Sequence, residues 1–173
     1  PYIFADCQIC SKFTINFPSN EEMSINLSKY NLRYRKSDKG IAVFDKLRGK
    51  YVALTPEESV RQGFVEFLTS ELSYPGGLMG NEVSIIQNGI KRRCDTVVYN
   101  RNGNPVMIVE YKASTVNITQ EVFNQIYRYN IVLQVKYLVV TNGIAFYCCE
   151  IDYDNMVCRF IDHIPSYNEL IKD

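Results

Sequence analysis

The chain has 173 residues, 46% of them hydrophobic and 22% charged, a composition that excludes intrinsic disorder and fits one globular domain with a sizeable core. Nineteen basic residues balance nineteen acidic ones, which excludes a uniformly positive, nucleic-acid-coating protein and leaves local basic patches for any contact with DNA. No apolar run approaches the ~18 residues of a membrane span and no secretory signal opens the chain, so we expect a cytoplasmic protein without membrane contact.

The first third of the chain combines an irregular segment with a predicted hairpin. Residues 1–22 contain apolar side chains without helical or strand periodicity, and Pro18-Ser19-Asn20 is typical of a break. The stretch "IAVFDKLRGKYVALT", residues 41–55, has two apolar runs around a polar centre. This pattern predicts a hairpin with Gly49 in its turn.

The stretch "TPEESVRQGFVEFLTSEL", residues 55–72, predicts a helix. Thr55 is a typical N-cap, Pro56 suits the first turn, and Glu58 completes a Thr-x-x-Glu capping box. Apolar residues recur at helical spacing and form one face: Val60, Phe64, Phe67, Leu68 and Leu72. A Pro-Gly-Gly sequence at 75–77 ends this element.

The remaining chain predicts several strands and one more long helix. The order is helix, three-strand meander, helix, strand, strand, which indicates an α/β domain with a mixed central sheet. The strands are expected at 82–87, 94–99, 105–114, 136–143 and 144–152. The helix is expected at 119–133, with Thr119 as its cap and with Val122, Ile126, Tyr129 and Leu133 on its apolar side.

Two carboxylates are predicted to face each other across the second hairpin. A type I′ turn centred on Asn102-Gly103 would pair residues whose numbers sum to 205, which places Asp95 opposite Glu110. Opposite residues share a face with Cβ atoms roughly 5 Å apart. Lys112 stands on the same face as Glu110, because residues two apart in a strand point the same way.

Such a pair of acids requires compensation. One carboxyl could stay protonated, a cation such as Lys112 or Arg93 could neutralise the pair, or a divalent metal such as Mg²⁺ or Mn²⁺ could bridge it. Two acids beside a lysine are suited to metal-assisted phosphodiester hydrolysis, with Lys112 orienting the attacking water. The residues alone leave all three compensations open.

These residues resemble the Asp…Glu-x-Lys core of the PD-(D/E)XK nuclease superfamily, whose α-β-β-β-α-β core has the same element order. "TPEESVRQ", the Gln-x-x-x-Tyr pair in "NQIYRY" and the strand "YLVVTNG" are similar to the N-terminal nuclease domain of type I restriction enzyme R subunits. The resemblance runs from about Met23 to Ile164. It implies one nuclease-like domain over residues 23–173, with residues 1–22 as an N-terminal extension.

The resemblance implies a role for each matching residue. Asp95 and Glu110 would bind Mg²⁺, for which Mn²⁺ can substitute, together with the backbone carbonyl of Tyr111. Lys112 would be the catalytic lysine. Glu58 would contact the metal, directly or through water, although a capping-box glutamate needs no catalytic role. Site support or DNA contact is expected from Gln125, Tyr129, Arg92 and Arg93.

The chain also departs from the resembled families. Cys94, not proline, precedes Asp95, and the chain contains no Gly-x-x-x-x-Gly-Lys-Ser/Thr loop for an ATP-driven translocase. Partner proteins would therefore supply translocation or specificity, unless the nuclease stands alone. The alternatives are a catalytically inactive DNA-binding or scaffold module of the same fold and a carboxylate-dyad glycosidase. The oligomeric state is open, with a homodimer through residues 1–22 as one option.

The cysteines and two basic clusters complete the candidate features. Cys7-Gln8-Ile9-Cys10 has zinc-knuckle spacing but lacks a second ligand pair, so we expect the six cysteines to be reduced thiols, mostly in the core.

Two runs are candidate DNA contacts, with a solvated surface as the plainer interpretation: Lys91-Arg92-Arg93, and the cluster of Arg33, Arg35, Lys36 and Lys39.

Overall fold

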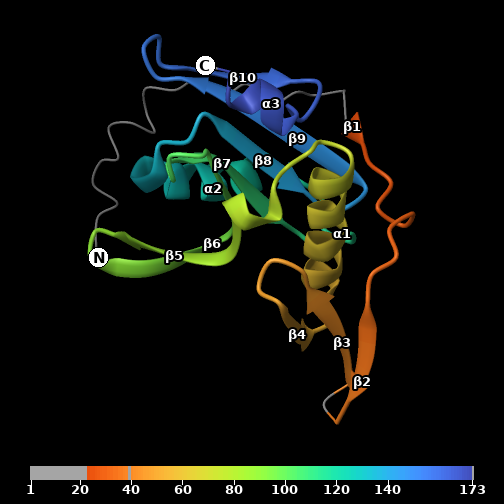
Figure 1. The fold of residues 1–173 in the computed structure, drawn as a ribbon. Helices are drawn as coiled ribbons and strands as arrows, with labels where there is room; N and C mark the ends of the chain where they lie inside the picture. The colour runs from red at the N-terminus through yellow and green to blue at the C-terminus, as the bar shows by residue number, and fades with distance from the viewer. Residues whose placement is uncertain (1–22, 39, 173) are drawn as a thin grey trace.

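The computed structural model describes residues 23–38 and 40–172, and it shows a mixed α/β fold (Figure 1). The elements in chain order are β1 (Met23–Ser24), β2 (Tyr34–Ser37), β3 (Gly40–Asp45), β4 (Lys50–Ala53), α1 (Pro56–Ser70), the 3₁₀ turn η1 (Gly76–Leu78), β5 (Met79–Gln87), β6 (Ile90–Tyr99), β7 (Pro105–Tyr111), α2 (Gln120–Leu133), β8 (Tyr137–Thr141), β9 (Ala145–Asp152), β10 (Val157–Ile161) and α3 (Tyr167–Leu170). The run α1-β5-β6-β7-α2-β8 confirms the predicted α-β-β-β-α-β core.

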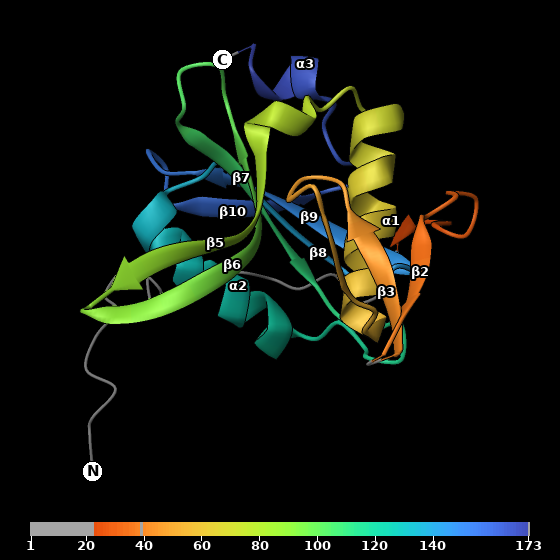
Figure 2. The same ribbon diagram turned by 60° about the horizontal axis from the view of Figure 1, so that its bottom comes forward.

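The central sheet has the strand order β1-β9-β8-β7-β6-β5, with β10 paired to β9. Among the strand pairs of the described residues, only β7–β8 is parallel, because α2 connects these two strands and crosses over one face of the sheet. The pairs β5–β6, β6–β7 and β8–β9 are antiparallel, and each joins two strands that are consecutive in the chain. A smaller sheet of order β2-β3-β4 lies beside α1 (Figure 2).

Helices cover both faces of the central sheet. Alternate residues of β7 point to opposite sides, so that Val109 packs with α1 and α3 whereas Ile108 packs with α2. The α1 side is built on Phe64 and Leu68, as predicted. The buried face of α2 is shifted from the prediction, because the side chains that reach the core are Phe123, Ile126, Tyr127 and Asn130.

The N-terminal hairpin and several strand ends differ in detail from the prediction. The hairpin forms as β3–β4, with Gly49 in a left-handed conformation (φ +64°) at its turn, and β2 adds a third strand that was not predicted. Strands β5 and β6 extend beyond the predicted runs. Strand β10 and helix α3 were not predicted either. No helix in the described part of the chain is long and apolar enough to cross a membrane.

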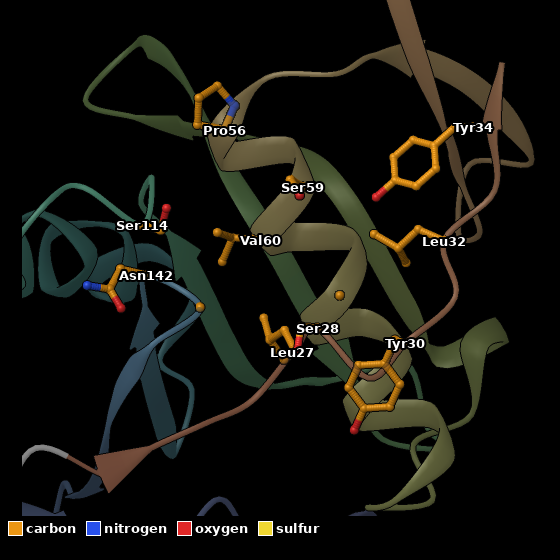
Figure 3. A pocket seen from close by; sticks show the side chains of 12 residues that line it. Leu27, Ser28, Tyr30, Leu32, Tyr34, Pro56, Ser59, Val60, Ser114 and Asn142 are labelled. Carbon is orange, nitrogen blue, oxygen red and sulfur yellow. The ribbon is translucent and has the colours of Figure 1, made fainter.

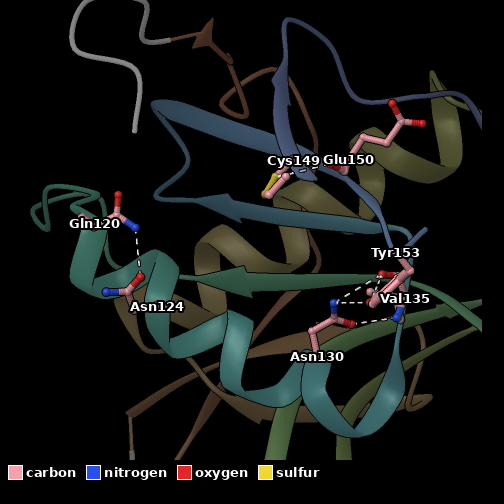
Figure 4. The surroundings of a disulfide bond; sticks show 8 residues. Gln120, Asn124, Asn130, Val135, Cys149, Glu150 and Tyr153 are labelled. Carbon is pink, nitrogen blue, oxygen red and sulfur yellow. Dashed lines mark hydrogen bonds between the residues drawn. A yellow bond between two sulfur atoms is a disulfide. The ribbon is translucent and has the colours of Figure 1, made fainter. Parts of the chain in front are cut away.

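The predicted extension 1–22, with the Cys7–Cys10 pair, lies outside the described residues. Within the described part, Cys94 and Cys148 are buried free thiols, as expected. Cys149 and Cys158 instead form a disulfide between β9 and β10, so the expectation of reduced thiols is wrong for this pair (Figure 4). The register places Cys158 opposite Ile151 and Cys149 opposite Phe160, which makes the two cysteines diagonal neighbours across the strands.

Candidate active site

The β6–β7 register brings Asp95 beside Glu110. The pairs Thr96–Val109, Val97–Ile108 and Val98–Met107 all follow the predicted sum of 205. The next position outward along this register is Asp95 with Glu110, and the Asp95 carboxylate accepts a hydrogen bond from the Tyr111 backbone N–H at 2.9 Å.

The turn that sets this register is not the predicted type I′ turn. Gly103 has a positive φ of +80° but Asn102 does not, and Gly103 N–H donates to the Asn100 carbonyl at 3.0 Å. This is a three-residue loop with a left-handed glycine. It pairs Tyr99 with Pro105, one residue out of the predicted register, and an irregularity between Val98 and Tyr99 restores the sum. Two departures from the prediction therefore cancel.

Lys112 is held against Glu110, as the strand periodicity predicts. The ammonium lies 3.0 Å from the Glu110 carboxylate and 3.3 Å from the Gln125 side-chain oxygen. The Gln125 amide donates weakly to Glu110 at 3.4 Å and to the Tyr129 hydroxyl at 3.3 Å. The Gln-x-x-x-Tyr pair of α2 thus supports the lysine and the glutamate from one side.

Arg61 of α1 is the main cation of this site, and it was not among the predicted site residues. Its guanidinium contacts Glu58 at 2.5 Å, Asp95 at 2.8 Å and Glu82 at 2.9 Å, and its side chain is 6% exposed. In the described structure its Nε has no hydrogen-bond partner. A signal existed in the sequence, since Arg61 follows Glu58 by three residues, the spacing at which helical side chains are neighbours.

Glu58 serves the charged cluster, not the capping box. Thr55 Oγ1 accepts from the Glu58 backbone N–H at 3.1 Å, which is the first half of the predicted box. The Glu58 carboxylate does not complete the box; it accepts from Arg61, from Gln62 at 2.8 Å and from Arg48 at 3.2 Å. The helix N-terminus therefore directs a buried acid towards the same arginine that binds Asp95.

Glu82 and Asp45 extend the cluster and had no local sequence signal. Glu82 adopts a left-handed backbone (φ +59°), which is uncommon for this residue type, and its carboxylate bridges Arg61 and Arg93. Asp45, fully buried at the end of β3, accepts from Asn81 at 3.0 Å and pairs with Arg48. Glu82 and Asp45 approach the cluster only through tertiary folding.

The basic triplet of β6 separates into two faces. Arg93 pairs with Glu82 at 2.7 Å and is 64% exposed, so it stands on the Asp95 side at the mouth of the site. Arg92 lies opposite Ile85, whose side chain packs with α2. The side chain of Arg92 therefore leaves the β5–β6 hairpin from the face opposite to that of Arg93. The structure brings Arg93 to the site and leaves Arg92 outside it.

Charge is unevenly balanced between the two central acids. Burial raises the pKa of Glu110 to about 7, and the negative charge of Asp95 adds to this rise, while Lys112 and Arg61 oppose it. For Arg61, burial works against ionisation, but the charges of Asp95, Glu58 and Glu82 outweigh it and raise the pKa. Lys112 and Arg61 thus provide compensation by internal cations, one of the three predicted alternatives. Their positive charge does not outweigh the burial and the charge of Asp95 that raise the pKa of Glu110.

A divalent cation fits the chemistry of these donors. Carboxylate and carbonyl oxygens are the ligands that Mg²⁺ and Mn²⁺ prefer, and a nearby cation would favour the ionised form of the buried Glu110. No three His, Cys, Asp or Glu side chains in the described part of the chain are already arranged around one metal position. Asp95 and Glu110 would therefore hold the ion with backbone oxygen or water as further ligands.

A pocket of about 330 Å³ lies beside α1, and its lining does not include Glu58 or Arg61 of the charged cluster (Figure 3). Ser59 and Val60 project into it from the helix, and Tyr34, Ser114 and Asn142 approach from other elements. All of its lining residues are uncharged. It is thus separate from the acid–lysine set and lacks a counter-charge for a phosphate.

The fold and the site together define a class: an α/β domain with a mixed sheet in which two acids and a lysine meet beside a helix-borne glutamate. The model of the family described as type I restriction enzyme R protein N terminus matches residues 56–165. The chain belongs to this family.

Solved structures support the fold. A fragment of a protein assigned as the HsdR subunit of a type I restriction enzyme from Vibrio vulnificus YJ016 superposes with a TM-score of 0.51 at 21% sequence identity. The match covers 70% of this chain but 25% of that one, so this chain spans about a quarter of the length of that fragment. No curated protein matches the chain.

Proposed function

We propose that this domain is a metal-dependent DNA endonuclease module that hydrolyses phosphodiester bonds, as part of a type I restriction system. The observation that carries the proposal is that Asp95, Glu110 and Lys112 lie close together at the paired strands β6 and β7, with Lys112 Nζ 3.0 Å from Glu110, in a chain that belongs to an R-subunit family. Bound Mg²⁺ would supply Lewis acidity and lower the pKa of a water molecule.

The protein side chains would divide the remaining work. Asp95 and Glu110 would hold the cation, with the Tyr111 carbonyl beside them. Lys112 would orient the attacking water and offset the charge that develops on the phosphate oxygens. Gln125 fixes the lysine by its 3.3 Å hydrogen bond.

Glu58 and Arg61 would act indirectly. Arg61 binds one Asp95 oxygen at 2.8 Å, and the Tyr111 N–H binds the other. These two contacts set the orientation of the carboxylate. Glu58 in turn fixes Arg61, so a positioning role accounts for its burial as well as direct metal contact would. Metal contact by Glu58, directly or through water, remains part of the proposal.

Partner subunits that supply translocation and specificity are also part of the proposal, because the matched HsdR chain is much longer than this one. The second candidate function is a catalytically inactive DNA-binding or scaffold module with the same fold. The neutral net charge favours it, whereas the intact acid–acid–lysine set favours an enzyme.

The deciding experiment follows plasmid cleavage and Mg²⁺ binding by the same variants. Asp95→Ala should abolish Mg²⁺-dependent cleavage and the heat of Mg²⁺ binding in calorimetry. Lys112→Ala should reduce cleavage by at least about a hundredfold but leave Mg²⁺ binding intact or tighter, because a positive charge near the ion is removed. Asp154→Ala, at an exposed turn position, is the charge-matched control and should behave like wild type.

Two results would contradict the proposal. Unchanged cleavage by Asp95→Ala would remove the nuclease assignment from this site. A wild-type protein that binds DNA but shows neither cleavage nor Asp95-dependent Mg²⁺ heat would instead be the scaffold module.

A further inference from the structure

The positive charge of this neutral chain is concentrated in one short region. Residues 29–50 contain eight basic and two acidic residues, so the rest of the chain carries an excess of acid. Half of this region lies in the strands β2, β3 and β4 of the small sheet. Three of these basic residues, Lys29, Lys46 and Arg48, form ion pairs with acids. The positive charge that remains attracts a polyanion over several ångströms, and it lies outside the acid–lysine site described above.

The small sheet has two different faces. Opposite residues of neighbouring strands share a face, so Val43 and Tyr34 point to one side and Phe44 with Tyr51 to the other. Val43 is fully buried, and Tyr34 lines the pocket against α1. The face with Phe44 and Tyr51 is therefore directed away from α1.

Two arginines are held on this outer face by the two aromatic rings. The guanidinium carbon of Arg33 lies 3.7 Å from the centroid of Phe44, and that of Arg35 lies 4.4 Å from the centroid of Tyr51. The two rings pack edge to face at 5.3 Å. We call the surface made by Arg33, Arg35, Phe44 and Tyr51 the basic face.

Stacking orders these side chains without neutralising them. Arg33 and Arg35 are exposed, and among the described residues neither forms an ion pair with an acid. A ring can shield one side of a guanidinium while the N–H groups at its edge stay available for two hydrogen bonds to a phosphate. The two arginines are two residues apart in an extended segment, or roughly 7 Å, so each can meet a different phosphate.

The small sheet is fixed to the charged cluster. Asp45 ends β3 and accepts from Asn81 of β5 at 3.0 Å, and Arg48 of the following turn contacts Glu58 at 3.2 Å. A polyanion bound to the basic face is therefore held at a defined position relative to Asp95 and Glu110.

We propose that the basic face binds the phosphate backbone of duplex DNA. This inference rests on the proposed function for its choice of DNA, and it assigns a surface outside the catalytic residues. Because phosphate contacts carry no base information, the face should bind without sequence preference and position the duplex for the site.

The test measures binding without cleavage. Full-length Arg33→Gln/Arg35→Gln is titrated into a fluorescent 30-base-pair duplex in EDTA, over a series of salt concentrations. At 0.1 M salt the double variant should bind at least about ten times more weakly than wild type, and the slope of log K against log salt should fall by about 2. Arg159→Gln/Lys172→Gln removes the same charge at the opposite end of the molecule, near β10 and α3 (Figure 1), and should match wild type.

A second double variant tests the stacking of the arginines on the aromatic rings. Arg33→Lys/Arg35→Lys keeps both charges but loses the planar group, so binding should lie between that of wild type and the glutamine variant. Unchanged melting temperatures would show that the substitutions affect only the surface.

The outcomes separate this inference from the proposed function. Equal weakening by the control pair, or no weakening by the glutamine variant, would overturn the basic face while leaving cleavage by Asp95 and Lys112 untouched. Loss of DNA binding in the glutamine variant, together with a wild type that never cleaves, would retain the basic face and refute the nuclease. Stronger charge-dependent binding of poly-glutamate than of DNA would identify an acidic protein as the partner and overturn the proposal.

Discussion

Arg61 is the single residue on which the charged cluster depends most. Three carboxylates, those of Glu58, Glu82 and Asp95, converge on its nearly buried guanidinium. Removing one partner of such a buried network leaves uncompensated charge, which typically costs about 3–5 kcal/mol. Arg61 thus couples the stability of α1 to the orientation of Asp95, and a variant at this position would combine both effects.

Glu110 offers a cleaner test at the residue scale, because its pKa is raised to about 7, first by burial and then by Asp95. The folded state keeps its proton in a range where the unfolded state loses it. Stability from this group is therefore full below the ordinary pKa of a glutamate and is lost as the pH rises towards 7. In EDTA, wild type should lose up to about 3 kcal/mol relative to Glu110→Gln between pH 4 and pH 8.

Urea unfolding at several pH values measures this difference. Glu121→Gln, at an exposed position of α2, serves as the control and should follow the wild-type curve. If wild type and Glu110→Gln show parallel stability curves across this range, the site does not hold a protonated glutamate near neutral pH.

The β6–β7 hairpin is the element that assembles the site. Its loop fixes the register, and a slip by one residue would turn Asp95 to the opposite face of the sheet. Gly103 is the left-handed residue of this loop, with φ +80° and open space around its Cα. The backbone conformation alone therefore explains the need for glycine at this position.

This geometry predicts contrasting effects for two glycine substitutions. Gly103→Ala should destabilise the protein by about 1 kcal/mol, because a Cβ disfavours the left-handed region. Gly77→Ala also meets no neighbouring atom, and its φ is outside that region, so it should be neutral or stabilising by up to about 1 kcal/mol. Chemical denaturation of both variants gives the comparison, and equal effects would mean that the loop does not strain a non-glycine residue.

At the scale of the whole molecule, the site draws on both helices that cover the central sheet, since α1 supplies Arg61 to Asp95 and α2 supplies Gln125 to Lys112. Strand β9 pairs with β8, β1 and β10, so segments from both ends of the described chain close this edge of the sheet. Tyr74 and Tyr167 tie the C-terminal segment to the core, since the Tyr74 hydroxyl donates to the Pro165 carbonyl at 2.7 Å and the Tyr167 N–H donates to Leu72 at 2.9 Å.

We predict that residues 1–22 are dispensable for this core. The described elements from β1 onward already contain both hydrophobic clusters and every proposed site residue. Deleting residues 1–22 should preserve a single cooperative unfolding transition and the Mg²⁺ heat of the full chain. A truncated protein that unfolds without cooperativity would place this segment inside the core, and a change from dimer to monomer in sedimentation would assign it to self-association.

The sequence by itself determined the order of the core elements from α1 to β8 and the central acid–acid–lysine set. These depend on local rules: strand alternation places Lys112 beside Glu110, and helical spacing defines α1. The register from Thr96 to Val98, next to Asp95, was also predicted correctly, although the turn type was wrong and an irregularity at Val98 and Tyr99 restored the pairing.

Only the tertiary structure decided how the site is charged and what surrounds it. The sequence left two roles open for Glu58, the capping box and a contact with the metal. The fold turns its carboxylate towards Arg61. Glu82 and the Cys149–Cys158 disulfide likewise depend on chain segments that approach only on folding. The physical reason is that electrostatic and packing contacts depend on distance in space, whereas sequence patterns report only the neighbours along one helix or strand.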